Sequence, residues 1–452
     1  MNELDLSQPE YYINRELSLL QFQRRVLAQA SNENIPLLER LRFLCISSTN
    51  LDEFFQIRVA GLMHRAALEA STGALENLTP EQMLDLIRNE THSLVEEQYR
   101  VLNDVLIPEL DNEGIRFLKR TEWDDNLAGW IKRHFTTQIL PVLSPLGLDP
   151  AHPFPRVFNK SLNFIISLEG KDAFGRDSGI AIVHAPRSLP RLIKLPKKYA
   201  GKDAYVFLTS IIHTHVSDLF PGMNVTGCYQ FRVTRDSELF IDDEESDDLM
   251  RTIKGELSLR RLTDAVRLEV ADNCTKDMSK FLLKKFKLNE NDLYTVNGPV
   301  NLNRLLEVID DVDRPDLKYP PFTPGLPKRI LQEEDMFNAI EQGDILLFHP
   351  YESFAPIINL LNQAAQDPKV LAIKMTLYRA GADSPLVDAL VDAAKSGKEV
   401  TVVVELRARF DEAANIELAS RLQDAGAHVV YGVVGYKTHA KMFLIVRRDK
   451  KK

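Results

Sequence analysis

The sequence predicts a multidomain protein of mixed α/β and α+β class, in which a helical domain comes first and an α/β domain last. Three observations support this. A chain of 452 residues exceeds what one hydrophobic core usually serves. Apolar residues recur at helical spacing up to about Ile107, and a proline-rich run then separates an irregular middle part from a regular strand–helix alternation. The predicted domains are residues 1–111, 112–318 and 319–452.

The N-terminal domain is predicted to be helical. Apolar residues recur at helical spacing in Glu16–Leu27 and again in Leu37–Ile46. A longer amphipathic stretch, Pro80–Ile107, closes this part of the chain.

The middle domain mixes strand-like and helical segments in no regular order, which favours an α+β arrangement over a wound sheet. Helices are expected at Leu127–Ile139 and Lys276–Phe286. The strand-like runs are Leu162–Leu168, Ile180–His184, Tyr205–Leu208, Gln230–Thr234 and Val266–Val270.

The segment Tyr319–Pro327 holds four prolines and a glycine, so it cannot form a regular element and marks a domain boundary. Beyond it, strands and helices alternate, which predicts a mostly parallel sheet covered on both faces. The expected strands are Asp344–Phe348, Val370–Tyr378, Val400–Leu406 and His428–Val434, and the expected helices are Phe354–Gln366, Pro385–Ser396 and Asp411–Asp424.

Composition points to an ordinary water-soluble protein of the cytoplasm, with peripheral membrane association as the alternative. Hydrophobic residues make up 44% and charged residues 27%. Cys45, Cys228 and Cys274 fit no metal-ligand spacing, and we expect small buried residues rather than disulfides. No signal peptide or bilayer-spanning run is evident. A net charge of −9 does not suggest a nucleic-acid binder.

The segment Lys437–Lys441, followed by an apolar run, carries the clearest chemical signal. In a strand, alternate side chains share a face, so Lys437, His439 and Lys441 would point the same way. Nearby cations favour the neutral, nucleophilic form of histidine and attract a phosphoryl group. The alternative is a histidine at a strand end beside two solvated lysines. The residues expected to face the packed side are Thr438, Ala440, Met442 and Leu444.

Arginines follow two of the predicted strands, where ligands of parallel sheets gather. Arg379 follows one strand, and Arg407 and Arg409 follow the next. Arg379, Arg409 and His439 lie 30 residues apart (409 − 379 and 439 − 409), about one strand–helix repeat, so they should converge. Guanidinium groups suit phosphate oxygens. Alternatively, the arginines pair with surface acids such as Asp383 or Asp411.

The stretch Ser47–Phe55 reads as a helix start. Asn50 can cap the helix, and Asp52 and Glu53 favour the positive end of its dipole. That structural role is a sufficient explanation. The amide could also contact an adenine edge.

Five motifs in this order resemble the type-1 polyphosphate kinase family over essentially the whole chain: Tyr12–Ser18, Asn50–Phe54, Val370–Lys374, Val404–Glu412 and Lys437–Lys441. The resemblance implies an N-terminal helical domain, a head domain and C-terminal domains similar to phospholipase D. It implies reversible transfer of the terminal phosphate of ATP to polyphosphate, with ATP or ADP and inorganic polyphosphate as partners, in a homo-oligomer.

The resemblance also assigns roles. It makes His439 the phosphohistidine nucleophile and Asn50 an ATP contact, and it places Arg379 and Arg409 at a Mg²⁺ site. A guanidinium has no acceptor lone pair, so we expect both arginines to bind the phosphate oxygens that hold the ion. Lys437 and Lys441 are possible phosphate contacts.

Members of the family continue past the point where this sequence stops, so the chain resembles a fragment that ends within its first phospholipase-D-like domain. The resemblance places a second catalytic histidine beyond Lys452. Two alternatives stay open. The H-x-K motif also occurs in phospholipase-D-like phosphodiesterases. The longer motif of those enzymes has an aspartate that would fall near Val446, where this sequence has none. The chain could also bind nucleotide or dimerise without activity.

Overall fold

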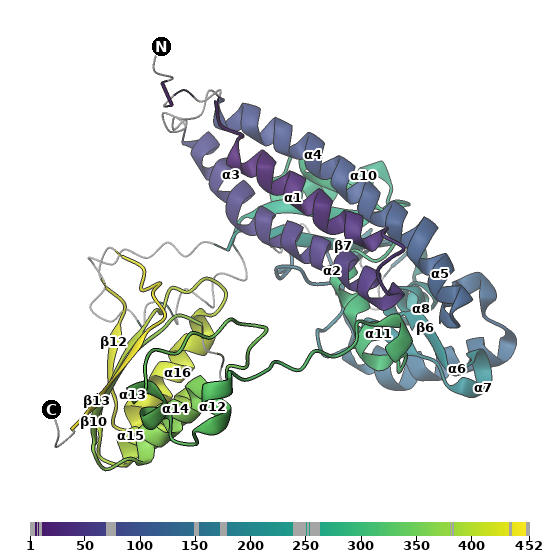
Figure 1. The fold of residues 1–452 in the computed structure, drawn as a ribbon. Helices are drawn as coiled ribbons and strands as arrows, with labels where there is room; N and C mark the ends of the chain where they lie inside the picture. Colours follow the sequence, from purple (N-terminus) through teal and green to yellow (C-terminus); the bar gives the residue numbers. More distant parts are fainter. Residues whose placement is uncertain are drawn as a thin grey trace. The chain divides into compact units, whose positions relative to one another are not determined.

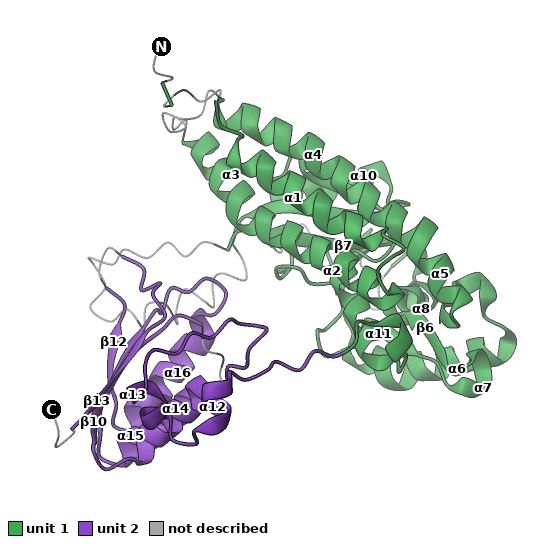
Figure 2. Ribbon diagram, in the orientation of Figure 1, with its two compact units in different colours: residues 1–238, 260–320 green, residues 239–259, 321–452 purple. Residues whose placement is uncertain are grey.

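The computed structural model describes residues 5–6, 8, 11–68, 78–148, 153–171, 179–237, 250, 253, 263–379, 381, 384–433 and 436–448. The chain forms two compact units (Figure 2). Unit 1 comprises residues 1–238 and 260–320, and unit 2 comprises residues 239–259 and 321–452. The division between residues 320 and 321 falls inside the proline-rich run Tyr319–Pro327.

Unit 1 begins with the helices that the apolar spacing predicts: α1 (Arg15–Ala30), α2 (Leu37–Phe54), α3 (Ala60–Ala67), α4 (Pro80–Arg100) and α5 (Ile107–Asn112). Asn14 caps α1 by accepting hydrogen bonds from two backbone N–H groups, and Thr79 and Gln82 form a reciprocal cap on α4. Short π-helical turns, Phe55–Val59 and Val101–Leu106, continue α2 into α3 and α4 into α5.

The rest of unit 1 is an α+β region around two sheets. A six-stranded sheet has the order β2-β4-β3-β7-β8-β9, in which only the β8–β9 pair is parallel, and a three-stranded sheet has the order β1-β6-β5. The strands are β1 (Ile115–Phe117), β2 (Ser144–Gly147), β3 (Asn163–Glu169), β4 (Ile180–His184), β5 (Leu192–Lys194), β6 (Asp203–Phe207), β7 (Asn224–Arg235), β8 (Ala265–Ala271) and β9 (Leu293–Val296). The helices of this region include α6 (Asp125–His134), α8 (Leu208–His215), α10 (Lys276–Phe286) and α11 (Leu306–Asp311).

Unit 2 has a four-stranded sheet in the order β12-β11-β10-β13. Its strands are β10 (Val370–Leu377), β11 (Glu399–Val404), β12 (His428–Tyr431) and β13 (Phe443–Arg447), and its main helices are α14 (Ala355–Gln366), α15 (Pro385–Lys395) and α16 (Glu412–Asp424). β10, β11 and β12 are mutually parallel, as predicted, whereas β13 pairs antiparallel with β10.

The expectation that helices cover both faces of this sheet is wrong for the described residues. Figure 1 shows α14, α15 and α16 on the same side. Val400, Val402 and Val404 of β11 are buried on that side, while the two residues between them are only half-buried. β13 follows the same alternation: Phe443 and Ile445 pack against the core, while Leu444 is 55% exposed.

The predicted strand Asp344–Phe348 does not form. These residues have no regular secondary structure, and the side chains of Leu346 and Phe348 are 90% and 66% exposed. An apolar run becomes a strand only where it finds a hydrogen-bonding partner. Both neighbours of β10 are already present, as β11 and β13.

Cys45 and Cys228 are buried, as expected for small apolar residues, and burial raises the pKa of each thiol to about 12. Cys274 is half-buried. In the ranges given above, no helix combines the length and the apolar character that a bilayer crossing requires.

Candidate active site

The candidate site in unit 2 is built where two parallel strands end. β10 is followed by Tyr378 and Arg379, and β11 by Glu405–Arg409. Because β10 and β11 are neighbours and run the same way, these residues meet at one edge of the sheet. The backbone N–H of Glu405 donates to the carbonyl of Leu377 at 2.9 Å, which continues the ladder to this edge.

Arg379 lies close to Arg409, as the 30-residue spacing predicts. Its Nη2 donates to the carbonyl oxygen of Arg409 at 2.7 Å, and its Nε lies 2.7 Å from Oδ2 of Asp411. The alternative in which an acid pairs with this arginine is therefore also present, through Asp411. Asp383, the other acid considered, lies outside the described residues. Arg379 is about half exposed, which leaves its remaining N–H groups open to solvent and to a ligand.

Two residues that the sequence analysis did not single out hold this edge together. Asn415 of α16 is buried, and its Nδ2 donates to the carbonyl oxygens of both Tyr378 and Glu405, each at 2.8 Å. Between Arg409 and Asp411, Phe410 adopts a positive φ of 74°, which turns the chain from the strand end into α16.

The buried carboxylate of Glu405 fixes the segment that carries His439. Its Oε1 accepts from the backbone N–H of Arg407 at 3.1 Å, and its Oε2 accepts from the backbone N–H of Thr438 at 2.8 Å. Lys437 Nζ donates to the carbonyl of Arg407 at 3.3 Å. Its position in the sequence could have suggested Glu405 as a residue of this site, because Glu405 directly follows β11 just as Tyr378 directly follows β10.

The prediction that Lys437–Lys441 forms a strand is wrong. These residues have no regular secondary structure, and β13 begins only at Phe443. The expected packing of Met442 and Leu444 is also wrong, because their side chains are 62% and 55% exposed. The physical reason is that Glu405 binds the backbone at Thr438, which takes that N–H out of reach of a strand partner.

His439 is exposed and lies against Tyr378. The ring centroids are 5.0 Å apart at an interplanar angle of 75°. The same tyrosine ring has Lys441 Nζ 4.5 Å and Arg379 Cζ 5.5 Å from its centroid. Lys441 Nζ also donates to the carbonyl oxygen of His439 at 2.6 Å. The structure thus gathers His439, Lys441 and Arg379 around one aromatic side chain.

Five cationic residues lie at this edge: Arg379, Arg407, Arg409, Lys437 and Lys441. Asp411 contacts the side chain of Arg379, and Glu405 accepts from the backbone N–H of Arg407. An exposed edge of this kind suits a phosphate-bearing anion.

Arg379 and Arg409 do not fit as direct ligands of Mg²⁺, because guanidinium groups have only N–H donors. Across the residues that the structure describes, no three His, Cys, Asp or Glu side chains are placed to hold a metal ion. The arginines fit phosphate oxygens instead.

Asn50 belongs to unit 1, and the helix start predicted there is wrong. Asn50 lies inside α2, and its Nδ2 donates to Oε1 of Gln23 at 3.0 Å. The apolar residues on both sides of Asn50 keep the helical spacing, so the polar run does not interrupt the helix.

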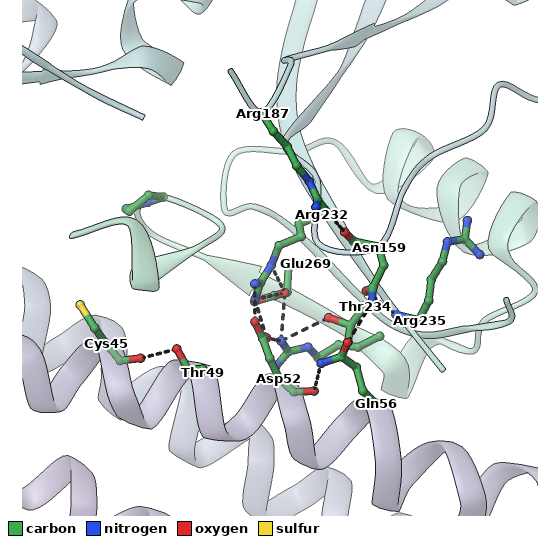
Figure 3. Close-up of polar contacts among 12 residues, drawn as sticks. Cys45, Thr49, Asp52, Gln56, Asn159, Arg187, Arg232, Thr234, Arg235 and Glu269 are labelled. Atoms are coloured by element: carbon green, nitrogen blue, oxygen red, sulfur yellow. Dashed lines mark hydrogen bonds and ion pairs between the residues drawn. The ribbon is translucent and has the colours of Figure 1, made fainter. Parts of the chain in front are cut away.

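Asp52, next to Asn50 in the same motif, has a structural role. Its carboxylate accepts from Arg232 at 2.8 and 3.0 Å and also from Arg267, and both arginines contact Glu269 (Figure 3). Burial alone would raise the pKa of Asp52, but the Arg232 and Arg267 guanidinium groups outweigh it and hold the pKa below its ordinary value.

Three family models match the chain. They describe the polyphosphate kinase N-terminal domain (residues 12–118), middle domain (127–308) and C-terminal domain 1 (335–452). Polyphosphate kinase of Pseudomonas syringae pv. tomato is 56% identical over 446 residues, which cover 98% of this chain and 61% of the relative. The relative in Pseudomonas putida is 58% identical over 445 residues, with the same coverage.

The crystal structure of polyphosphate kinase from Porphyromonas gingivalis superposes with a TM-score of 0.78 at 28% identity, covering 97% of this chain and 62% of that one. Fold and comparisons define a multidomain α/β protein with a helical N-terminal region, a middle domain and a phospholipase-D-like C-terminal region. The chain belongs to the polyphosphate kinase family. It spans 61% of the length of the two Pseudomonas relatives.

Proposed function

We propose that the protein takes part in reversible transfer of the terminal phosphate of ATP to inorganic polyphosphate, through a phosphohistidine at His439. In the first step, a ring nitrogen of His439 bonds to the γ-phosphorus while the bond from that phosphorus to the β,γ-bridging oxygen breaks. ADP leaves with the electron pair. In the second step, a terminal oxygen of polyphosphate bonds to the phosphorus and the N–P bond breaks, which frees the ring.

The observation that carries this proposal is the exposed His439 ring, held against Tyr378 with Arg379 and Lys441 around the same tyrosine. A nucleophile for a phosphoryl group must reach solvent and must face cations that balance charge on the equatorial oxygens. Arg379 and Lys441 supply such charge. Glu405 and Asn415 hold the segments that carry these residues, so that the site needs little rearrangement to react.

Mg²⁺ is the proposed cofactor. Bound by the nucleotide phosphates, it would neutralise part of their negative charge. The residues that would face those phosphates are Arg379 and Arg409, with Lys437 and Lys441 as further contacts.

Asn50 is a proposed contact to the adenine of ATP, through the amide that now bonds Gln23. A homo-oligomer and a location in the cytoplasm are part of the same proposal. Both are supported by membership of the family alone.

The experiment measures covalent labelling by ATP that carries radioactive phosphorus at the γ position. The 452-residue chain is compared with a chimera in which the remaining length is supplied by the Pseudomonas aeruginosa relative, which is 57% identical to this chain. We expect acid-labile, base-stable label in the chimera. His439→Ala should reduce the label to background, because the N–P bond then has no nitrogen to form on.

The matched control is His428→Ala, which removes another exposed histidine of unit 2, at the start of β12. Label that survives in the His439→Ala chimera, or that is lost equally in the His428→Ala chimera, would overturn the assignment of His439. Offering the chimera a phosphodiester substrate separates the proposal from phosphodiesterase activity: hydrolysis without polyphosphate formation would favour the latter.

A further inference from the structure

A pocket in unit 1 is lined by five cationic side chains that the proposed reaction does not use. They are Lys160, Arg187, Arg191, Arg232 and Arg304. The pocket has a small cavity of about 30 Å³ and is partly open to solvent. Its lining comes from β7 and from segments far apart in the sequence. Figure 3 shows two of these residues, Arg187 and Arg232.

Most of this positive charge has no carboxylate partner among the residues that the structure describes. The guanidinium of Arg191 donates only to backbone carbonyl oxygens, those of Ala185, Pro186 and Leu189, at 3.0–3.3 Å. Arg187 likewise donates to the backbone carbonyl of Asn159 at 3.0 Å. These bonds satisfy N–H groups but leave the positive charges unbalanced.

The remaining cations divide into one that is balanced and two that are not. Arg232 is neutralised by Asp52 and Glu269. Arg304 has one acid, Glu307, at 3.8 Å, and both side chains are about 40% exposed, so solvent weakens the pair. No residue in the described part of the chain forms a hydrogen bond or an ion pair with Nζ of Lys160.

The pKa values of two side chains that line the pocket are lowered. Burial, reinforced by the positive charge of Arg304, lowers the pKa of Arg191 to about 10. Burial also lowers the pKa of Lys160, against the opposing effect of Asp52. An anion in the pocket would lower the free energy of the charged forms of these side chains.

A side-chain amide at the wall supports the same conclusion. Oδ1 of Asn301 is buried and has no hydrogen-bond partner among the described residues. The oxygen and nitrogen of an amide are interchangeable by a half turn. That turn would present N–H donors to an anion from the position where Oδ1 has no partner among the described residues.

We propose that this pocket is a second phosphate-binding site, made entirely of unit 1 residues and distinct in composition from the His439 site. Guanidinium and ammonium groups arranged around a small volume bind tetrahedral oxyanions well. The ligand class is a phosphate group, whether free or part of a polyphosphate or a nucleotide. In naming polyphosphate as one source, the inference rests on the proposed function, whereas binding of orthophosphate does not.

The test is calorimetric titration of the 452-residue chain with tripolyphosphate in 0.1 M salt. Arg379→Gln serves as the background, because it weakens the unit 2 site. Adding Lys160→Met or Arg304→Gln should raise the Kd for tripolyphosphate about tenfold or more, the effect of losing one charge-assisted contact. The matched control is Arg100→Gln, which removes an exposed arginine of α4 in the same unit.

Unchanged binding in both pocket variants, or equal weakening by Arg100→Gln, would overturn the proposal. If Lys160→Met does not fold, as judged by circular dichroism, Arg304→Gln decides, since that side chain is partly exposed. Orthophosphate and ADP, titrated in parallel, identify which phosphate source the pocket prefers. The measurement is independent of covalent labelling at His439, so either proposal can fail without the other.

Discussion

At the scale of single residues, Asp52 joins the helical part of unit 1 to its sheet. It stands on α2, whereas Arg232 stands on β7 and Arg267 and Glu269 on β8. All four side chains are at least 95% buried. A buried ion cluster of this kind contributes little net stability when intact, but removing one member leaves uncompensated charge in the interior.

We therefore expect Asp52→Asn to lower the free energy of unfolding of unit 1 by about 3–5 kcal/mol, because two buried arginines would then share one carboxylate. Chemical denaturation followed by circular dichroism measures the loss. Asp85→Asn is the control: Asp85 pairs with Arg88 at 3.2 Å but is 65% exposed, and its loss should cost less than about 1 kcal/mol. Equal effects of the two substitutions would contradict the buried-charge argument.

At the scale of elements, β13 shows how a strand pairs with its neighbour while only one of its faces is covered. Ile445 lies opposite Ile373 of β10 on the helix-covered side, and Leu444 lies opposite Lys374 on the other. Adjacent residues of one strand therefore differ in how much apolar contact they make.

Ile445→Ala should destabilise unit 2 by about 2 kcal/mol, since it removes apolar contacts with the core. Leu444→Ala should change stability by no more than about 0.5 kcal/mol, because that side chain is already 55% exposed. Urea unfolding monitored on both variants measures the difference. A larger effect at Leu444 would mean that the opposite face of the sheet is covered in solution.

The elements that the sequence predicts correctly are those whose pattern lies within the segment itself. The helix predicted at Lys276–Phe286 has the same limits in the structure, where Thr275 caps its N-terminus. Its start and its apolar spacing are both encoded by neighbouring residues. The convergence of Arg379 and Arg409 followed from the repeat length. The prediction of a strand at Asp344–Phe348 is wrong, since strand pairing depends on distant segments that the local sequence pattern does not include.

The same distinction divides the residues of the two proposed sites. His439 and the arginines were found by motif and spacing, whereas Glu405 and Asn415 act through hydrogen bonds across 33 and 37 residues. The pocket of unit 1 had no sequence signal at all. Its cations are separated by up to 144 residues (304 − 160) and meet only when the sheet forms.

At the scale of the molecule, the described part of unit 1 contains four half-buried histidines whose pKa is shifted in the same direction. Burial lowers the pKa of each below the ordinary 6.5, and for three of them nearby cations add to the effect. They are His134, His184, His213 and His215. Since the unfolded chain then binds more protons than the folded one, stability is fully present above pH 6.5 and declines as the pH falls below it.

The melting temperature of unit 1 should therefore fall when the pH is lowered from 7.5 to 5.5. Differential scanning calorimetry across this range measures the slope. His134→Gln should make the slope of melting temperature against pH shallower, because it removes one titrating group whose pKa is lowered by burial. A melting temperature that is constant or rises towards pH 5.5 would contradict the linkage.

The π-helical turn Phe55–Val59 determines where the helix that contains it can tolerate an insertion or a deletion. A π-turn holds one more residue than regular α-helical pitch requires. If the same residues took regular α-helical pitch, one flank would rotate relative to the other by about 100°. Either Asp52 would swing away from Arg232, or Leu62 would leave the interior. The π-turn thus keeps two buried faces aligned along one continuous helix. Adding or removing a residue in the regular turns on either side, where no π-turn takes it up, should be more damaging than most substitutions there.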